Sequence, residues 1–178
     1  MNSCRESAER PGREQVAEGF RAGAFKSRFF GLKISTAMSA AELPSTFHIT
    51  VTVEPADIDE MDHVNNAVYL RWAQAAAVAH WNAAASEHMK AETLWVVLRH
   101  EIDYKSPALL GDELIVTTWV GVATRATFER LTEISRLKSD GSATLLAKAR
   151  TLWCPIDART RRPKRVDEEI RARFSTVE

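Results

Sequence analysis

The sequence is poor in several features that mark particular classes of protein. Its 178 residues include only two cysteines, Cys4 and Cys154, which form no C-x-x-C pair. Neither a disulfide framework nor a zinc ribbon is therefore indicated, and a reducing cytosol suits the chain best. No apolar run approaches the ~20 residues that span a bilayer, and the first residues lack the apolar core of a secretory signal. We predict a cytoplasmic protein with no membrane partner.

An excess of either charge is absent as well. Lysine and arginine together number 24, and so do aspartate and glutamate. A positive field that attracts nucleic acid is therefore not expected. The five histidines show no ligand spacing such as H-E-x-x-H, so we expect no metal site. No phosphate-binding loop, dinucleotide fingerprint or G-x-S-x-G elbow occurs, and we predict no cofactor.

The length fits one domain with an N-terminal tail. Residues 1–44 mix charged residues, glycine and serine with little periodicity, and we predict that they form a disordered extension. Periodic patterns begin at Thr46 and continue to Phe174, so residues 45–178 are expected to form the folded domain.

Hydrophobic periodicity predicts five strands and one long helix. Alternation of apolar and polar residues, ended by proline or glycine turns, predicts strands over 46–53, 94–105, 114–122, 127–138 and 143–154. Residues 67–85 are rich in alanine with apolar positions at helical spacing, and 167–174 fits a short charged helix. The order is a strand, the long helix, and four strands in a meander. We predict an α+β fold, a five-stranded antiparallel sheet wrapped around the helix.

The most informative run is residues 57–72, D-I-D-E-M-D-H-V-N-N-A-V-Y-L-R-W. It resembles the D-x-x-G-H-V-N-N-x-x-Y-x-x-W/F signature of the 4-hydroxybenzoyl-CoA thioesterase-like family of hot-dog thioesterases. Residues 96–108 and the Gly111-Asp112 turn are similar to the second strand and turn of its bacterial long-chain acyl-CoA thioesterase branch. The resemblance covers residues 47–166 and implies a hot-dog fold.

The resemblance also implies roles for residues in this run. Asp59 corresponds to the catalytic carboxylate, and the backbone N–H of Asn66 corresponds to the group that polarises the thioester carbonyl. A helix N-terminus favours such developing negative charge. His63 either orients the loop or the thioester, or satisfies backbone carbonyls. Asn65 suits a helix N-cap beside the substrate, and Tyr69 is either a packing residue or a pocket wall.

Two positions depart from the family pattern. Asp62 occupies a place where family members usually have glycine, so the loop is open to a different backbone angle or a second negative charge. Gln74 and Ala75 stand where the helix often carries a glutamate. Arg125, in the turn after the third strand, is a candidate for substrate binding through the CoA phosphates, and so is the basic cluster Arg159, Arg161, Arg162, Lys164 and Arg165.

Three functions remain open from the sequence. The first is an acyl-CoA thioesterase acting on a fatty or aromatic acyl-CoA, with Asp59 as base or nucleophile, working as a homodimer or tetramer as the resemblance implies. The second is a non-catalytic acyl-CoA-binding protein, favoured by Asp62. The third is a hot-dog enoyl-CoA hydratase, which is disfavoured because His63 follows Asp59 one residue too soon for that group's D-x-x-x-x-H arrangement.

Overall fold

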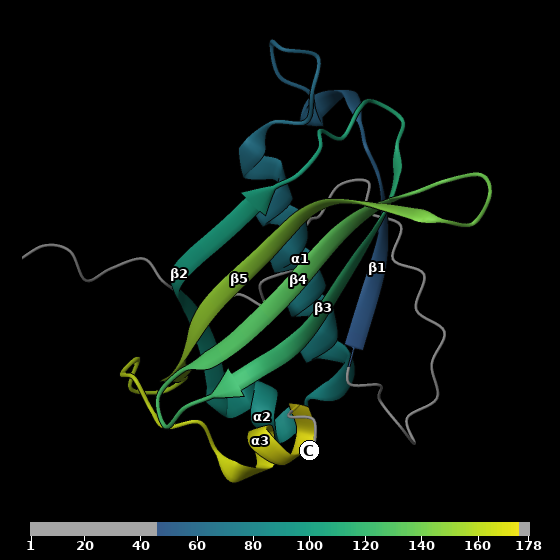
Figure 1. Cartoon of the computed structure of the whole chain (residues 1–178). Coiled ribbons are helices and arrows are strands. Elements are labelled where there is room, and N and C mark those ends of the chain that lie inside the picture. The colour runs from purple at the N-terminus through teal and green to yellow at the C-terminus, as the bar shows by residue number, and fades with distance from the viewer. Residues whose placement is uncertain (1–45, 175–178) are drawn as a thin grey trace, which may run out of the picture. The chain divides into compact units, whose positions relative to one another are not determined.

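The computed structural model of the protein describes residues 46–174 (Figure 1). The predicted extension over residues 1–44 lies outside the described residues, so its disorder stays a prediction. The elements are β1 (Thr46–Thr52), a 3-10 helix η1 (Pro55–Asp57), α1 (Asn66–Ala84), α2 (Glu87–Glu92), β2 (Thr93–Tyr104), β3 (Glu113–Ala123), β4 (Phe128–Leu137), β5 (Ala143–Asp157) and α3 (Glu168–Phe174). None of the described helices is long and apolar enough to cross a bilayer.

The five strands form one antiparallel sheet in the order β1-β3-β4-β5-β2. Strands β3, β4 and β5 form the predicted meander, and the Asp140-Gly141 turn joins the last two, with Gly141 at φ 82°. The meander prediction is wrong for β2, which pairs with β5. Strand β2 cannot pair with β3, because β1 and β4 already occupy both sides of β3; it lies instead on the outer side of β5.

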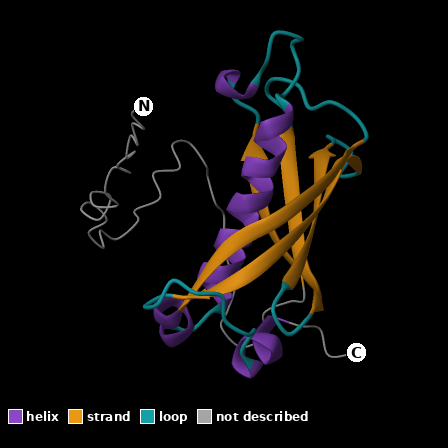
Figure 2. Cartoon of the chain, turned by 90° about the vertical axis from the view of Figure 1, so that its left-hand side faces the viewer, coloured by secondary structure: helices purple, strands orange, loops and turns teal. Residues whose placement is uncertain are grey.

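Helix α1 lies against one face of this sheet, as Figures 1 and 2 show. Its contact face carries alanine, including Ala75 and Ala76, so the helix backbone can approach the strands closely. Opposite it, alternate residues of β3 and β4 such as Leu114, Val116 and Ile134 are fully buried. Burial of these side chains on a continuous core is what joins helix and sheet.

A β-bulge in β2 changes which residues face α1. Val97 pairs with Trp153 and Arg99 pairs with Leu152, which leaves Leu98 as the extra residue. Simple alternation along residues 94–104 therefore predicts the wrong face for half of the strand, because a bulge inverts the pattern beyond it. Leu98 is 58% exposed as a result.

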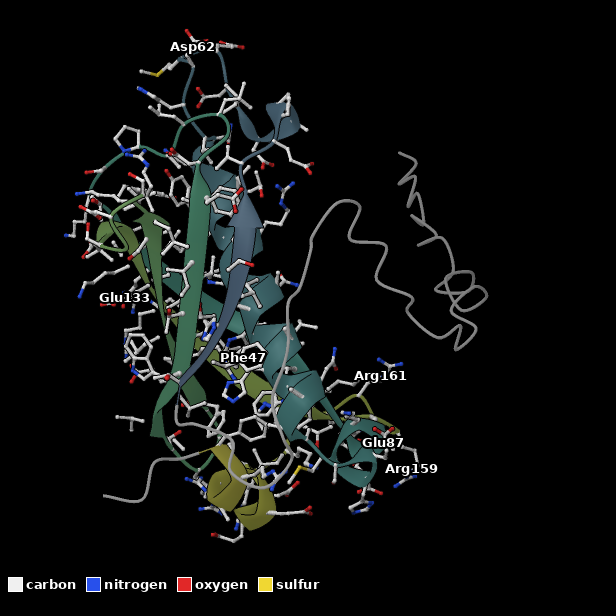
Figure 3. The ribbon with its side chains drawn as sticks, turned by 90° about the vertical axis from the view of Figure 1, so that its right-hand side faces the viewer. Phe47, Asp62, Glu87, Glu133, Arg159 and Arg161 are labelled. Atoms are coloured by element: carbon white, nitrogen blue, oxygen red, sulfur yellow. The ribbon has the colours of Figure 1, made fainter. Side chains whose placement is uncertain are left out.

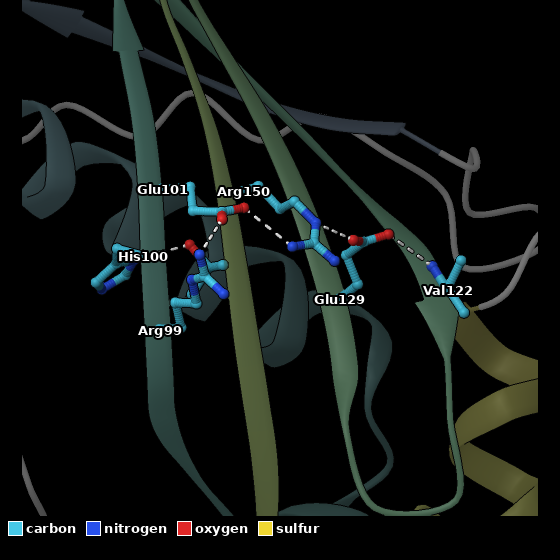
Figure 4. Close-up of polar contacts among 7 residues, drawn as sticks. Arg99, His100, Glu101, Val122, Glu129 and Arg150 are labelled. Atoms are coloured by element: carbon cyan, nitrogen blue, oxygen red, sulfur yellow. Dashed lines mark hydrogen bonds and ion pairs between the residues drawn. The ribbon is translucent and has the colours of Figure 1, made fainter.

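The other face of the sheet carries an ion-pair ladder across β2, β5 and β4 (Figure 4). Arg150 contacts Glu101 at 3.0 Å and also pairs with Glu129, and Glu101 pairs with Arg99. The second oxygen of Glu129 accepts the N–H of Val122 at 3.0 Å. This bond and Arg150 hold the pKa of Glu129 below its usual value. Such exposed pairs contribute little stability each.

Candidate active site

The loop between β1 and α1 contains a small hairpin over residues 58–64. Ile58 and Val64 form an isolated bridge. The Asp59 N–H donates to the His63 carbonyl at 2.8 Å, and the Asp62 N–H donates to the Asp59 carbonyl at 3.1 Å. These bonds close the turn and bring residues at both ends of the hairpin close to the start of α1.

Asp62 has a φ of 60°, which is the left-handed region that glycine favours. Aspartate enters this region more easily than most residues. Asp62 therefore has a backbone angle that a glycine at this position would also adopt readily. The exposed Asp62 lies at the outer tip of the loop (Figure 3).

Asp59 is half-buried at the base of the same hairpin. Its Oδ1 accepts the N–H of Met61 at 2.9 Å. Its Oδ2 has no hydrogen bond or ion pair with any residue between 46 and 174. One carboxylate oxygen is thus held by the turn, while the other is free to meet a substrate or a water molecule.

An ion pair between a buried aspartate and a half-exposed arginine fixes this loop on the helix. Asp57 is 4% exposed and pairs with Arg71 of α1, and its Oδ2 accepts the Glu54 N–H at 3.1 Å. The Asp57 carbonyl accepts the Asn65 N–H at 2.9 Å. Sequence reasoning missed this pair, because Asp57 stood in an acidic run that suggested solvent and Arg71 is fourteen residues away.

Asn65 is the N-cap of α1, as its sequence position predicted. Its Oδ1 accepts the N–H of Ala67 at 2.9 Å. Asn66 is the first residue of the helix, and its N–H makes no hydrogen bond to another described residue. The Asn66 carbonyl accepts the hydroxyl of Tyr104 at 2.9 Å. The first helical turn is therefore anchored while an N–H donor stays available beside Asp59's loop.

Two tyrosines support that turn from the sheet side. The Tyr69 hydroxyl accepts the N–H of Ala108 at 2.8 Å, and the Ala108 carbonyl accepts the N–H of Val64 at 3.0 Å. Tyr69 and Tyr104 meet edge to face with centroids 5.3 Å apart. Burial raises the pKa of both hydroxyls, so they stay protonated at neutral pH. Tyr69 thus packs in the core and connects the loop before β3 to the site.

The remaining candidates differ in where they lie. His63 is half-buried in the hairpin, and its ring makes no hydrogen bond within the described part of the chain. Arg125 does not lie near Asp59. Strand β3 starts beside the end of β1, and Arg125 follows the opposite end of β3. There the Arg125 carbonyl accepts the N–H of Val166. Figure 3 also shows Arg159 and Arg161 at the end of the described domain opposite Asp62.

Comparisons with known proteins assign the family. Residues 53–174 match the Thioesterase-like superfamily, and the chain belongs to it. The prediction of a thioester-hydrolase class is confirmed at this level. A comparison with curated sequences found no significant match.

Solved thioesterase structures share the fold of this chain. A thioesterase from Thermus thermophilus, complexed with coenzyme A and Zn, is 27% identical with a TM-score of 0.61, over 72% of this chain and 90% of that one. A 1,4-dihydroxy-2-naphthoyl-CoA thioesterase from Synechocystis is 24% identical with a TM-score of 0.59, over 69% and 90%. A mutant of 4-hydroxybenzoyl CoA thioesterase, complexed with 4-hydroxybenzoyl CoA, is 16% identical with a TM-score of 0.66, over 74% and 100%. The predicted hot-dog fold is confirmed.

Proposed function

We propose that the protein hydrolyses a fatty or aromatic acyl-CoA to the free acid and CoA, with Asp59 as base or nucleophile. The observation that carries this proposal is the half-buried carboxylate of Asp59, one oxygen of which has no partner in the described residues, on the loop that leads into α1. Membership of the thioesterase-like superfamily supports the reaction class.

In this reaction the N-terminus of α1 stabilises the negative charge of the transition state. The thioester carbonyl oxygen accepts a hydrogen bond from the Asn66 N–H, where the helix dipole stabilises the negative charge that develops. Asp59 either attacks the carbonyl carbon or removes a proton from an attacking water. The carbon–sulfur bond then breaks and CoA leaves as a thiolate, which needs no strong general acid. If Asp59 attacks directly, the product is a mixed anhydride with its carboxylate, and a water molecule hydrolyses this anhydride to release the free acid and restore Asp59. His63 orients the loop or the thioester beside them.

The active unit in this proposal is a homodimer, which can pair further into a tetramer. Strand β2 is an edge strand of 12 residues, with Val96 and Leu98 exposed along it. An exposed apolar edge of this length favours pairing with a second strand. Because Arg125 follows the far end of β3, a role for it in binding CoA phosphates requires that the substrate cross the subunit boundary.

The first test is Asp59→Asn, with thiol release from a panel of acyl-CoAs as the measurement. The substitution removes the base or nucleophile but keeps an acceptor for the Met61 N–H, so kcat should fall by about 100- to 10,000-fold while the circular dichroism spectrum stays unchanged. Asp62→Asn in the same loop is the matched control and should keep its activity. Full activity of Asp59→Asn contradicts the assignment.

The same panel decides between catalysis and binding alone. Saturable binding of acyl-CoA without thiol release selects the non-catalytic binding protein instead. Hydration of crotonyl-CoA selects the enoyl-CoA hydratase. Asp62 has a left-handed backbone angle that glycine also adopts, so a changed turn gives no support to the binding protein. The added charge of Asp62 is the remaining argument for that alternative.

A further inference from the structure

A second site lies further along α1, away from Asp59. It is a pocket between the helix and the sheet, with walls that include Ala77, Trp81, Trp95, Phe128 and Trp153. Ala77 comes eleven residues after Asn66, so the pocket begins about 16 Å along the helix from its first residue. Three of the chain's five tryptophans line this pocket. Apart from Arg130, its walls are apolar, which suits an aromatic or aliphatic body.

Arg130 of β4 also lines the pocket, and it carries a buried charge. It is 6% exposed, and no carboxylate between residues 46 and 174 lies within ion-pair distance of it. Its Nη1 donates to Nδ1 of His80 at 3.0 Å and to Oγ1 of Thr118 at 3.3 Å. Burial lowers the pKa of Arg130 to about 10, so the guanidinium stays protonated at neutral pH.

His80 cannot neutralise this charge. Burial, and then the charge of Arg130, lower the pKa of His80 to about 4. At neutral pH the ring is therefore uncharged, and its Nδ1 acts as the acceptor. An uncompensated buried charge destabilises a fold by several kcal/mol. Arg130 thus donates hydrogen bonds to neutral groups but lacks a counter-charge within the described residues.

Three hydrogen-bond donors around the pocket have no acceptor within residues 46–174. The Nε and Nη2 of Arg130 make no hydrogen bond within residues 46–174, yet they are not among the atoms sealed from solvent. The indole Nε1 of Trp153 is sealed and has no partner in the same range. A guanidinium fork with free donors, set among apolar walls, matches the planar geometry of one carboxylate.

We propose that this pocket binds an aromatic or long-chain aliphatic carboxylate, with Arg130 as the residue that holds the carboxylate group. The apolar walls take the body of the ligand and the arginine takes its single negative charge. Two sources share this chemistry: a free carboxylic acid, or the far end of an acyl thioester that carries a second carboxylate. The proposal goes beyond thioester hydrolysis, because binding requires no turnover.

The test is calorimetric titration of the full chain with naphthoic acid and decanoic acid, each matched by its uncharged amide. At least one acid should bind, and its amide should bind at least tenfold more weakly, which corresponds to about 1.4 kcal/mol. In Arg130→Met the affinity for the acid should fall to that of the amide. Arg130→Lys keeps the charge without the fork and should lie between the two. Arg150→Met, on the opposite face of the sheet, is the matched control and should bind like the parent protein.

Arg130→Met is expected to fold. Replacing a buried charge by an apolar side chain of similar length is often neutral or stabilising, and circular dichroism verifies it. If Arg130→Met does not fold, the acid-to-amide ratio of the parent protein and the affinity of Arg130→Lys decide. Equal affinity for acid and amide, an unchanged affinity in Arg130→Met, or no binding of either acid overturns the proposal. Repeating the titration with Asp59→Asn, where binding should be unchanged, separates this outcome from failure of the proposed hydrolysis.

The source of the carboxylate is distinguished by kinetics. If the ligand is the end of a substrate, Arg130→Met lowers kcat/KM at least tenfold for an acyl-CoA with a terminal carboxylate and leaves the plain acyl-CoA unchanged. If the ligand is a free acid, Arg130→Met changes kcat/KM equally for the two substrates. The loss of affinity for the acid, measured by calorimetry, remains.

Discussion

Charged side chains have opposite surroundings at the two ends of α1. At the N-terminal end, Asp57 is paired with Arg71, and Asp59 has one oxygen tied by a backbone N–H. At the other end, Arg130 lies among aromatic side chains with the neutral His80 as its neighbour. The first arrangement depends on hydrogen bonds in a loop, and the second on packing in the core. Substitutions at the first end should therefore change chemistry, and those at the second end should mainly change stability.

The largest expected effect at the packed end comes from Phe174 of α3. Its ring is buried and meets Trp81, stacked at 5.4 Å, and also His80 and Phe128. Phe174→Ala should lower the free energy of unfolding by about 3 to 5 kcal/mol, since it leaves a cavity between α3 and α1. Urea unfolding followed by tryptophan fluorescence measures this. Phe174→Leu fills most of the space and should lose clearly less; equal losses for the two variants contradict cavity formation.

The next effect is a pH dependence that belongs to His80. Because its folded pKa is about 4, the unfolded chain binds a proton between pH 6.5 and 4 that the folded chain does not. Stability is therefore lost as the pH falls through this window, by about 1.4 kcal/mol per unit at most and about 3 kcal/mol in total. In His80→Gln this part of the loss should disappear. Unfolding free energies at pH 7.5 and 4.5 measure it.

The exposed His88 provides the matched control for this experiment. His88→Gln should lose as much stability on acidification as the parent protein, because its side chain is exposed and lies outside the contact between His80 and Arg130. An acid sensitivity that is the same in His80→Gln and His88→Gln would show that burial and the charge of Arg130 do not lower the pKa of His80 in the folded chain.

The sequence was most informative about the N-terminal end of α1. Alternation and turn residues placed all five strands to within a few residues, and Asn65 marked the start of the helix. Pairing was harder, since alternation assigns faces but not neighbours, and the bulge at Leu98 could not be seen in a regular pattern. A signal for Arg130 did exist. It shares its alternating face with Phe128 and Ile134, so a charge was placed among core residues.

The smallest effect returns to the loop and separates backbone angle from charge. Asp62 has a left-handed φ of 60° and an exposed side chain. Asp62→Gly should raise the free energy of unfolding by about 0.5 kcal/mol, because glycine adopts this angle without steric cost. Asp62→Val should lower it by about 1 to 2 kcal/mol, because a β-branched side chain is strained there.

Asp62→Asn is the control that removes only the charge. Asparagine tolerates the left-handed region as aspartate does, so the free energy of unfolding and kcat should both stay near their parent values. If Asp62→Asn and Asp62→Gly both changed kcat to a similar extent, the charge of this residue would act on the reaction, because both variants remove it and both tolerate the backbone angle. The loop would then resemble the Arg130 end of the helix, where an unpaired charge lies beside a binding pocket, and the contrast between the two ends would fail.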